Sequence, residues 1–181
     1  TFFTDARIPA SCLMGEDGGG WRVAMKTLEY ERGVTAGQAS GYWGLTIQVD
    51  DMIEALSNFE HDGEPLLSDP IVRDDLVGFI MESKALTLSG RRMAVPALNS
   101  DYPMGLALSV KYRGTEYERR MKQYTASKQG AQSALYVGDA DAVSGGFWQR
   151  AYFSNFGATI GGGTTQVQAN IIAEHVLGLP K

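Results

Sequence analysis

The sequence has one cysteine and two histidines in 181 residues, and these small numbers exclude several kinds of site. With Cys12 alone, the chain can form no internal disulfide and contains no CxxC pair. This fits a reducing compartment, so we expect a cytoplasmic protein. His61 and His175 do not form a pair at metal-ligand spacing, and we therefore expect no metal site.

Long apolar runs and an excess of positive charge are also missing. No stretch reaches the roughly 18 apolar residues that a membrane-spanning helix needs, and we find no signal-peptide pattern. The formal net charge of −5 gives no basic surface for nucleic acid. Neither a GxSxG nucleophile motif nor a phosphate-binding loop ending in GKS or GKT occurs. The composition, 44% apolar and 20% charged, is that of an ordinary chain with a core.

Apolar residues at helical spacing fill most of the sequence. After an extended lead-in over residues 1–14 and a glycine-rich turn, the pattern predicts a first helix from Trp21 through Leu56, interrupted by several glycines. Four further helices are predicted, over residues 70–95, about 104–135, 147–160 and 165–177, with a loop over 58–68. The sequence therefore predicts an all-α fold, an up-and-down antiparallel helical bundle with a short extended lead-in.

Two details of these helices are expected from local pattern. One face of the helix predicted over about 104–135 is charged and is interpreted as solvent-facing; it carries Lys111, Arg113, Glu118, Arg119, Arg120 and Lys122. The last helix is expected to begin with a capping box formed by Thr165 and Gln168, and to end at Gly178.

Two short segments could carry chemistry. The first is the run of three glycines at 161–163 before the last helix, where a ligand could touch backbone N–H groups. This junction is either an anion- or carbonyl-binding site or a tight turn between two helices. The second is EYERG at 29–33, where carboxylates lie beside a helix interruption. On a solvated helix these carboxylates would have no function.

Both ends of the chain resemble the carboxy-terminal part of acyl-CoA dehydrogenases. The matching segments are FFTDARIPASCLMGEDGGGWRVAMKTLEYERG at the start and GGGTTQVQANIIAEHVLGLP at the end. The resemblance implies that residues 1–16 are the end of the family's middle β-domain and a linker. It implies that residues 17–181 are the C-terminal helical bundle domain.

The resemblance also implies an activity, a cofactor and partners. In the family, a glutamate removes the α-proton of an acyl-CoA thioester, and FAD accepts a hydride from the β-carbon. An electron-transfer flavoprotein usually collects the electrons, so fatty acid or other lipid metabolism is expected. The subunits form homo- or hetero-oligomers, either dimers or tetramers.

The position of the catalytic glutamate differs within the family. Many members carry it directly before the closing Gly-Thr, and here that position is Gly162, ahead of Gly163 and Thr164. Isovaleryl- and long-chain-type members carry it on the first bundle helix, just before an arginine. That position is Glu31, followed by Arg32. The two positions face the same substrate carbon, so the resemblance implies that Glu31 is the base.

Further site residues follow from the same resemblance. The implied substrate-binding set, with the backbone of Gly163 binding the thioester oxygen, is Glu29, Arg32, Gly162 and Gly163. The implied contacts with FAD come from Thr164 and Gln166.

One feature departs from the family pattern. The family usually has an Arg-x-x-Phe-Gly motif after the first long helix, whose arginine reaches the FAD pyrophosphate of the neighbouring subunit. Here no arginine occurs between Arg32 and Arg73. Either the pyrophosphate is bound otherwise, or this subunit does not complete its neighbour's site, as in relatives that pair unlike subunits.

Two alternatives to the dehydrogenase interpretation stay open. One is a non-catalytic helical subunit that oligomerises with a partner flavoenzyme and completes it. The other is a relative among acyl-CoA oxidases or flavin monooxygenases. Under the leading interpretation, residues 1–181 alone are expected to be inactive, because half of the flavin pocket would be missing.

Overall fold

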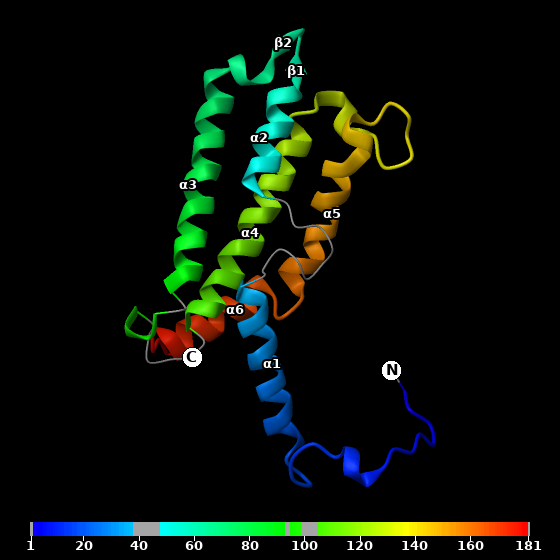
Figure 1. Ribbon diagram of the computed structural model, residues 1–181, viewed down its shortest axis with the longest axis vertical. Helices are drawn as coiled ribbons and strands as arrows, with labels where there is room; N and C mark the ends of the chain where they lie inside the picture. Colours follow the sequence, from blue (N-terminus) through cyan, green and yellow to red (C-terminus); the bar gives the residue numbers. More distant parts are fainter. Residues whose placement is uncertain (1, 38–47, 93–94, 99–104, 181) are drawn as a thin grey trace.

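A computed structural model of the chain describes the backbone of residues 2–37, 48–92, 95–98 and 105–180 (Figure 1). It describes the side chains of these residues except residue 29 and residues 31–37. The long helices α3 (Pro70–Arg92), α4 (Gly105–Ser127) and α5 (Phe147–Ile160) run up and down beside one another. This arrangement confirms the predicted all-α helical bundle.

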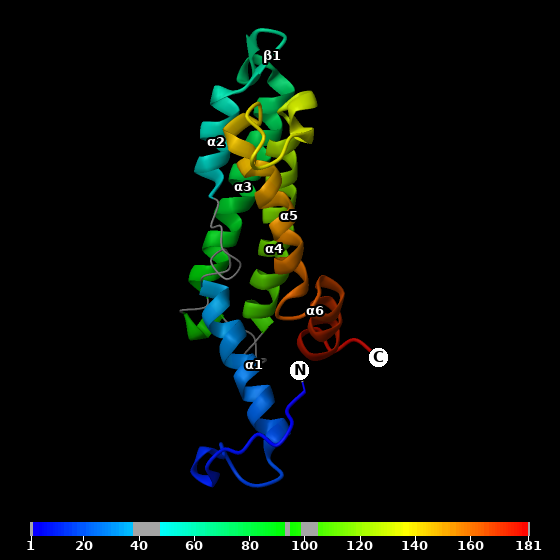
Figure 2. The same ribbon diagram turned by 90° about the vertical axis from the view of Figure 1, so that its right-hand side faces the viewer.

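The first helix, α1 (Gly20–Gly37), projects beyond the lower end of the bundle and carries the lead-in with it (Figures 1 and 2). Residues 2–9 have no regular structure and are followed by a 3-10 turn at Ala10–Cys12. The predicted extended lead-in is therefore interrupted by a turn. It forms no strand within residues 2–14.

The helix α2 (Val49–Asn58) is separate from α1, so the prediction of one interrupted helix from Trp21 through Leu56 is wrong at residue 48. Gln48 has extended backbone angles, with φ −93° and ψ 163°, and caps the new helix. The Asp51 carboxylate accepts a hydrogen bond from the Gln48 N–H at 2.6 Å, which fixes this start. The predicted interruptions at Gly41 and Gly44 lie outside the described residues.

A small hairpin occupies part of the predicted loop at 58–68. Strands β1 (Glu60–His61) and β2 (Glu64–Pro65) pair antiparallel, and a 3-10 turn, Leu66–Ser68, leads on to α3. Asp62 and Gly63 connect the strands with φ of 53° and 80°. Two consecutive left-handed residues of the Asp-Gly type make the tight turn that such a short hairpin needs.

The core lies where α4 passes through the middle of the bundle and contacts α1, α2, α3, α5 and α6. Apolar side chains from four helices pack together there, among them Met52, Leu56, Val72, Leu76, Tyr117, Met121, Trp148 and Ala151. Val110, Tyr117 and Met121 point inward as the helical spacing predicted. Because each side chain removes apolar area from water, this shared core holds the helices in place.

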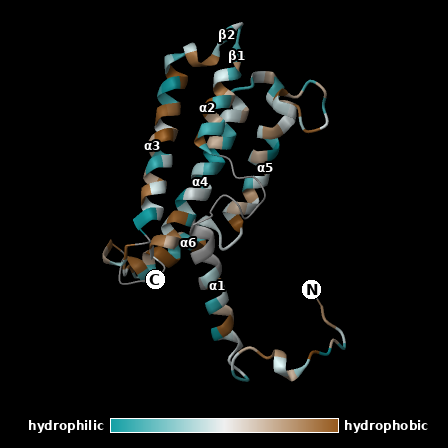
Figure 3. Cartoon of the chain, viewed as in Figure 1, coloured by the Kyte–Doolittle hydropathy of each residue, from teal (hydrophilic) through white to brown (hydrophobic). Residues whose placement is uncertain are grey.

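The chain ends with α6 (Thr165–Ile171), which continues as a π-helical turn at Ile172–Val176. Gly178, with φ of 66°, ends this segment as predicted. Hydrophobic and hydrophilic residues alternate in short stretches along the bundle (Figure 3). Among the described helices, we find none with the length and apolar content needed to cross a membrane.

Truncating the core should cost far more stability than truncating the surface. Leu56 is fully buried, so we expect Leu56→Ala to lower the free energy of unfolding by about 2–5 kcal/mol through the cavity it leaves. Leu88 on α3 is 59% exposed, and Leu88→Ala, the matched control, should cost about 0.5 kcal/mol or less. Urea denaturation measures both, and equal losses would contradict this assignment of the core.

Candidate functional site

The glycine turn between α5 and α6 has an unusual backbone. Gly162 and Gly163 follow one another with φ of 67° and 101°, in the region that residues with a side chain rarely adopt. A Cβ on Gly163 would lie 2.6 Å from Gln168 Nε2, so a side chain there would displace the amide that binds the Gly162 carbonyl. The turn therefore presents bare backbone, as a site that contacts a ligand through peptide groups requires.

Two buried side chains bind the carbonyl groups of this turn. Gln168, from the first turns of α6, donates from Nε2 to the Gly162 carbonyl oxygen at 2.6 Å. Lys111, from α4, donates from Nζ to the Gly163 carbonyl oxygen at 2.6 Å. Gln168 is fully buried and Lys111 is 9% exposed, while the glycines they bind are half-buried. The two hydrogen bonds fix the orientation of two successive peptide groups.

The start of α6 differs from the predicted capping box. Thr164, with φ −60° and ψ 159°, is the N-cap, and its hydroxyl oxygen accepts from the Val167 N–H at 3.3 Å. The predicted pair fails because both residues are engaged elsewhere: Gln168 binds the glycine turn, and Thr165 donates from its hydroxyl to Glu116 Oε1 at 2.6 Å. Thr165 thus ties α6 to α4.

Glu116 is held in its charged form by this contact. The hydrogen bond from Thr165 is the main cause that lowers the pKa of the Glu116 carboxyl, and partial burial opposes it. Arg119, whose Nε lies 3.1 Å from Glu116 Oε2, adds to the lowering. The junction between α4 and α6 is therefore a charge-assisted one at neutral pH.

The prediction that the charged face of α4 meets solvent is wrong for Lys111, Glu118 and Lys122, which are all buried. Lys122 donates to Glu118 Oε2 at 2.8 Å and to Asn155 Oδ1 of α5 at 2.7 Å. Burial raises the pKa of the Glu118 carboxyl above its ordinary value, even though Lys122 opposes this. These residues are buried because α4 is central and α5 covers this side of it.

The sequence contained a signal for this buried arrangement. Lys111, Thr115, Glu118 and Lys122 follow at intervals of four, three and four, which places them on one narrow stripe of the helix. We call these four residues the α4 polar stripe. The exposed residues Arg113 and Arg120 fall outside that stripe, so the spacing places the two groups on different sides of the helix.

The sequence-predicted residues fall into two groups in the structure. Gly162, Gly163, Thr164 and Gln166 lie together in the turn and the first residues of α6. Glu29, Glu31 and Arg32 lie in α1. For these three residues the structure describes the backbone and not the side chains. α1 and α6 both contact α4 and lie on either side of its N-terminal end (Figure 2).

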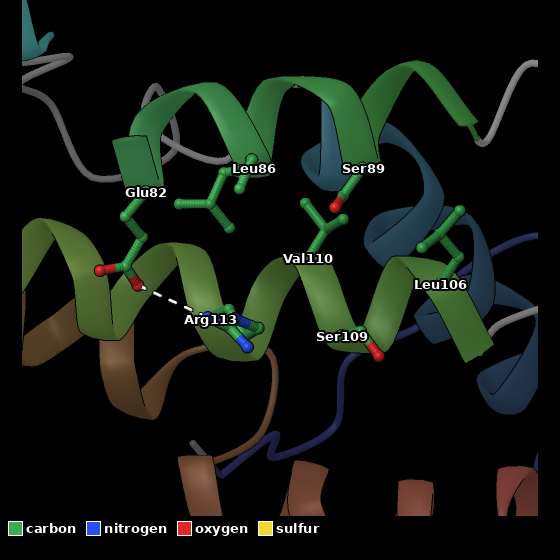
Figure 4. Close-up of a pocket in the computed structure, with 8 residues that line it drawn as sticks. Glu82, Leu86, Ser89, Leu106, Ser109, Val110 and Arg113 are labelled. Atoms are coloured by element: carbon green, nitrogen blue, oxygen red, sulfur yellow. Dashed lines mark ion pairs between the residues drawn. The ribbon is translucent and has the colours of Figure 1, made fainter. Parts of the chain in front are cut away.

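A separate cavity of about 210 Å³ lies between α3 and α4 (Figure 4). Leu86 and Val110 point toward one another within it, and an ion pair between Arg113 and Glu82, with Nη2 and Oε1 3.8 Å apart, closes one end. Arg113 faces nearly the opposite side of α4 from Lys111, and Val110 is rotated from Lys111 by about 100°. The cavity is therefore distinct from the glycine turn. Within the described residues, we find no group of His, Cys, Asp or Glu that could hold a metal ion.

Removing the Thr165 hydroxyl should change the acid stability of the protein. We expect Thr165→Val to raise the pKa of Glu116 toward the ordinary value of 4.5, because the largest lowering contact is lost. A folded-state pKa below the unfolded value stabilises the protein above the unfolded pKa, and this stabilisation is lost as the pH falls through the folded pKa. Wild type should therefore be the more stable protein at about pH 7, with the difference shrinking below about pH 4.5.

Urea denaturation at a series of pH values, with NMR titration of the Glu116 carboxyl, measures this change. Thr87→Val on α3 is the control, because that hydroxyl bonds only the Ser83 carbonyl of its own helix at 2.9 Å. A Thr165→Val defect that stays constant from pH 7 to pH 3 would show that Glu116 is not the partner that matters.

Comparison with known proteins gives this architecture a family. A family model described as the acyl-CoA dehydrogenase C-terminal domain matches residues 18–177. Acyl-CoA dehydrogenase IpdE1 of Mycolicibacterium smegmatis is 34% identical over 182 residues, which cover 99% of this chain and 42% of the relative. The chain thus spans less than half the length of that relative.

Two solved structures share the fold. A variant of the steroid acyl-CoA dehydrogenase Tcur3481-Tcur3483 matches with a TM-score of 0.79 at 23% identity, over 99% of this chain and 45% of that one. The ChsE4-ChsE5 complex from Mycobacterium tuberculosis matches with a TM-score of 0.76 at 23% identity, over the same shares. The family match covers most of the sequence and both its end motifs, so the chain belongs to the acyl-CoA dehydrogenase family and contains its C-terminal domain.

Proposed function

We propose that the protein containing this chain oxidises an acyl-CoA thioester to its α,β-unsaturated form, with FAD as cofactor. The observation that carries the proposal is the turn at Gly162 and Gly163, which has no side chains and whose two carbonyl groups are both hydrogen-bonded. In the same chain, Glu31 provides a carboxylate on α1. A turn without side chains can bind the thioester but cannot act as its base. The base must then come from another element.

Glu31 is the proposed base. It lies in the C-terminal half of α1, a helix that contacts α4 near the end where the glycine turn is bound. Proton abstraction next to a thioester needs a carboxylate whose pKa is raised by an apolar, water-excluding surrounding. In this proposal Glu29 and Arg32, in the same turn of α1, hold the substrate against it.

The Gly163 N–H is the proposed donor to the thioester oxygen. Negative charge gathers on that oxygen as the α-proton leaves, so a fixed N–H aimed at it lowers the barrier. Glycine at 162 and 163 lets the oxygen approach the backbone closely. The Gly162 carbonyl, bound by Gln168, sets the plane of the peptide group that carries this N–H.

The residues at the start of α6 fit a flavin. The Thr164 oxygen accepts from Val167, which leaves the hydroxyl hydrogen to donate to a ligand, and the exposed Gln166 amide offers both a donor and an acceptor. We propose that Thr164 and Gln166 hold FAD. When bound, FAD would supply the acceptor for the β-hydrogen, which leaves as a hydride with both electrons. Glu31 would take the α-hydrogen as a proton, and the electron pair left behind by the Cα–H bond would form the second bond between Cα and Cβ as the hydride leaves.

We infer that a partner subunit completes the assembly. The hairpin that stands where the family's FAD-binding arginine is expected carries three exposed acids, Glu60, Asp62 and Glu64, which would repel a pyrophosphate. Arg73 cannot replace the lost arginine in its present place, because Nη1 donates to the carbonyls of Leu67 and Ser68. The similar ChsE4-ChsE5 structure is a complex of two proteins, which is the kind of assembly we propose here. An electron-transfer flavoprotein is the proposed electron acceptor.

The lead-in is proposed to belong to another domain. Residues 1–16 would be the end of a β-domain and its linker, and residues 17–181 the helical domain. Phe2 and Phe3 are 99% and 83% exposed, as expected of residues whose packing partners lie elsewhere in the subunit. On this basis residues 1–181 alone would not turn over substrate.

The acidic hairpin also favours a second candidate function. A chain that no longer supplies a flavin contact to its neighbour could act as a non-catalytic helical subunit, which shapes a partner flavoenzyme. The dehydrogenase needs Glu31 as its base, whereas a non-catalytic subunit does not need Glu31 for any reaction.

Replacing the proposed base should abolish the reaction. In the full-length protein with any partner, we expect Glu31→Gln to lower kcat by about 10²–10⁴-fold, because the amide cannot accept the α-proton. Glu54→Gln, on the exposed side of α2, is the control and should leave kcat unchanged. Acyl-CoA-dependent reduction of a dye acceptor measures both. Full activity of Glu31→Gln would exclude Glu31 as the base and would favour the non-catalytic candidate.

The absence of the family's FAD-binding arginine should lower the number of FAD molecules bound per subunit. We expect the full-length protein purified alone to hold fewer than one FAD per subunit, because the acidic hairpin cannot bind a neighbour's pyrophosphate. Adding the partner subunit should restore flavin to about half of all subunits. Visible absorbance against protein concentration from amino-acid analysis measures the ratio. About one FAD per subunit in the protein alone would contradict the proposed unlike-subunit assembly.

A further inference from the structure

Lys111 controls a part of the candidate site that it does not itself enter. Its Nζ donates to the Gly163 carbonyl oxygen, although the two residues are 52 positions apart in the sequence. Gln168 holds the preceding carbonyl from within the same segment, six positions away. Of these two contacts, the one from Lys111 links the turn to the central helix of the bundle.

The two carbonyl contacts determine where the N–H groups point. In a planar trans peptide group, the carbonyl and the N–H of the next residue point in opposite directions. With the Gly162 carbonyl on Gln168, the Gly163 N–H is directed away from Gln168. With the Gly163 carbonyl on Lys111, the Thr164 N–H is directed away from α4. In the described part of the chain, we find no carbonyl that accepts from either N–H.

A buried ammonium group does more here than a neutral donor would. Hydrogen bonds from a charged donor are shorter and stronger than those from a neutral one, so Lys111 restricts the turn more firmly. A hydrogen bond to the carbonyl also polarises the peptide group, which makes the Thr164 N–H a better donor.

The α4 polar stripe contains a natural comparison for Lys111. Lys122 is equally buried on the same stripe, but it binds Glu118 and Asn155. It lies 11 residues further along α4, which is about 16 Å along the helix axis. Its removal with Glu118 therefore takes a buried ion pair out of α4, with no change in net charge and without touching the turn.

We propose that Lys111 is a positioning residue for the thioester-binding turn: it holds the Gly163–Thr164 peptide group so that the Thr164 N–H faces the substrate. The neighbouring Gly163 N–H, which Gln168 orients through the Gly162 carbonyl, faces the same side. The catalytic part of this inference, the effect of Lys111 on the reaction rate, rests on the proposed function. The structural part, the restraint of the turn, stands on the contact between Lys111 and Gly163 alone.

The test uses the full-length protein in its native assembly and compares Lys111→Met with the double variant Glu118→Gln with Lys122→Met. Hydrogen exchange measured by mass spectrometry over residues 161–165 reports the restraint. We expect Lys111→Met to speed exchange there by about 10-fold or more, while the double variant leaves it unchanged. In steady-state kinetics, we expect Lys111→Met to lower kcat by about 10–10²-fold, since a misplaced donor costs rate. The apparent KM should change less than about 3-fold.

Each part can fail by itself. Unchanged exchange over 161–165 in Lys111→Met overturns the restraint, whatever the enzyme does. Faster exchange with an unchanged kcat overturns the catalytic role of Lys111 while the proposed function stands. If the wild-type assembly does not oxidise any acyl-CoA, the proposed function fails, and the exchange comparison still decides the restraint. If Lys111→Met does not fold, Lys111→Gln, whose shorter side chain cannot reach the carbonyl, replaces it with the same expected exchange.

Discussion

The α4 polar stripe ties α4 both to α5 and to the glycine turn before α6. Lys122 reaches Asn155 of α5, and Asn155 in turn donates to the Thr115 carbonyl at 3.1 Å. One turn below Thr115, Lys111 binds the glycine turn. Buried charges are costly unless each is paired or hydrogen-bonded, so the bundle is constrained to the arrangement that satisfies them. The apolar core brings the helices together, and the stripe determines their register near the site.

The fold was largely predictable because it depends on periodic burial. The stripes through Val72 and Leu76 and through Tyr117 and Met121 repeat at helical spacing, and the structure buries all four residues. The break before α2 was missed because Gln48 is not a common N-cap, and its capping depends on Asp51 three residues later. The hairpin at Asp62–Gly63 was read as a loop because strands of two residues leave no alternating pattern.

The candidate site was predictable only in part, for a different reason. The glycines at 161–163 and the threonines after them stand out locally, and they lie in one turn as expected. The residues that bind this turn do not stand out, because a lysine on a helix usually indicates a solvated face. Lys111 is buried by its place on the central helix, which is a property of the packing. Spacing with Thr115 and Glu118 was the available signal, and it needed the location of α4 to be interpreted.

The two left-handed glycines are glycine for different physical reasons. At Gly163 the backbone angle disfavours a side chain, and a Cβ would also meet Gln168 Nε2 at 2.6 Å and displace the amide that binds the turn. At Gly162 the nearest atom to a Cβ is Lys111 Cε at 4.0 Å, an ordinary contact, so only the backbone angle disfavours a side chain. The turn can therefore keep its shape through Gly163 and its two bound carbonyls while residue 162 varies. A family that carries its base at this position in some members and on the first helix in others requires this separation of roles. Under the proposed function, a glycine at 162 leaves the turn free to bind substrate, and α1 supplies the base.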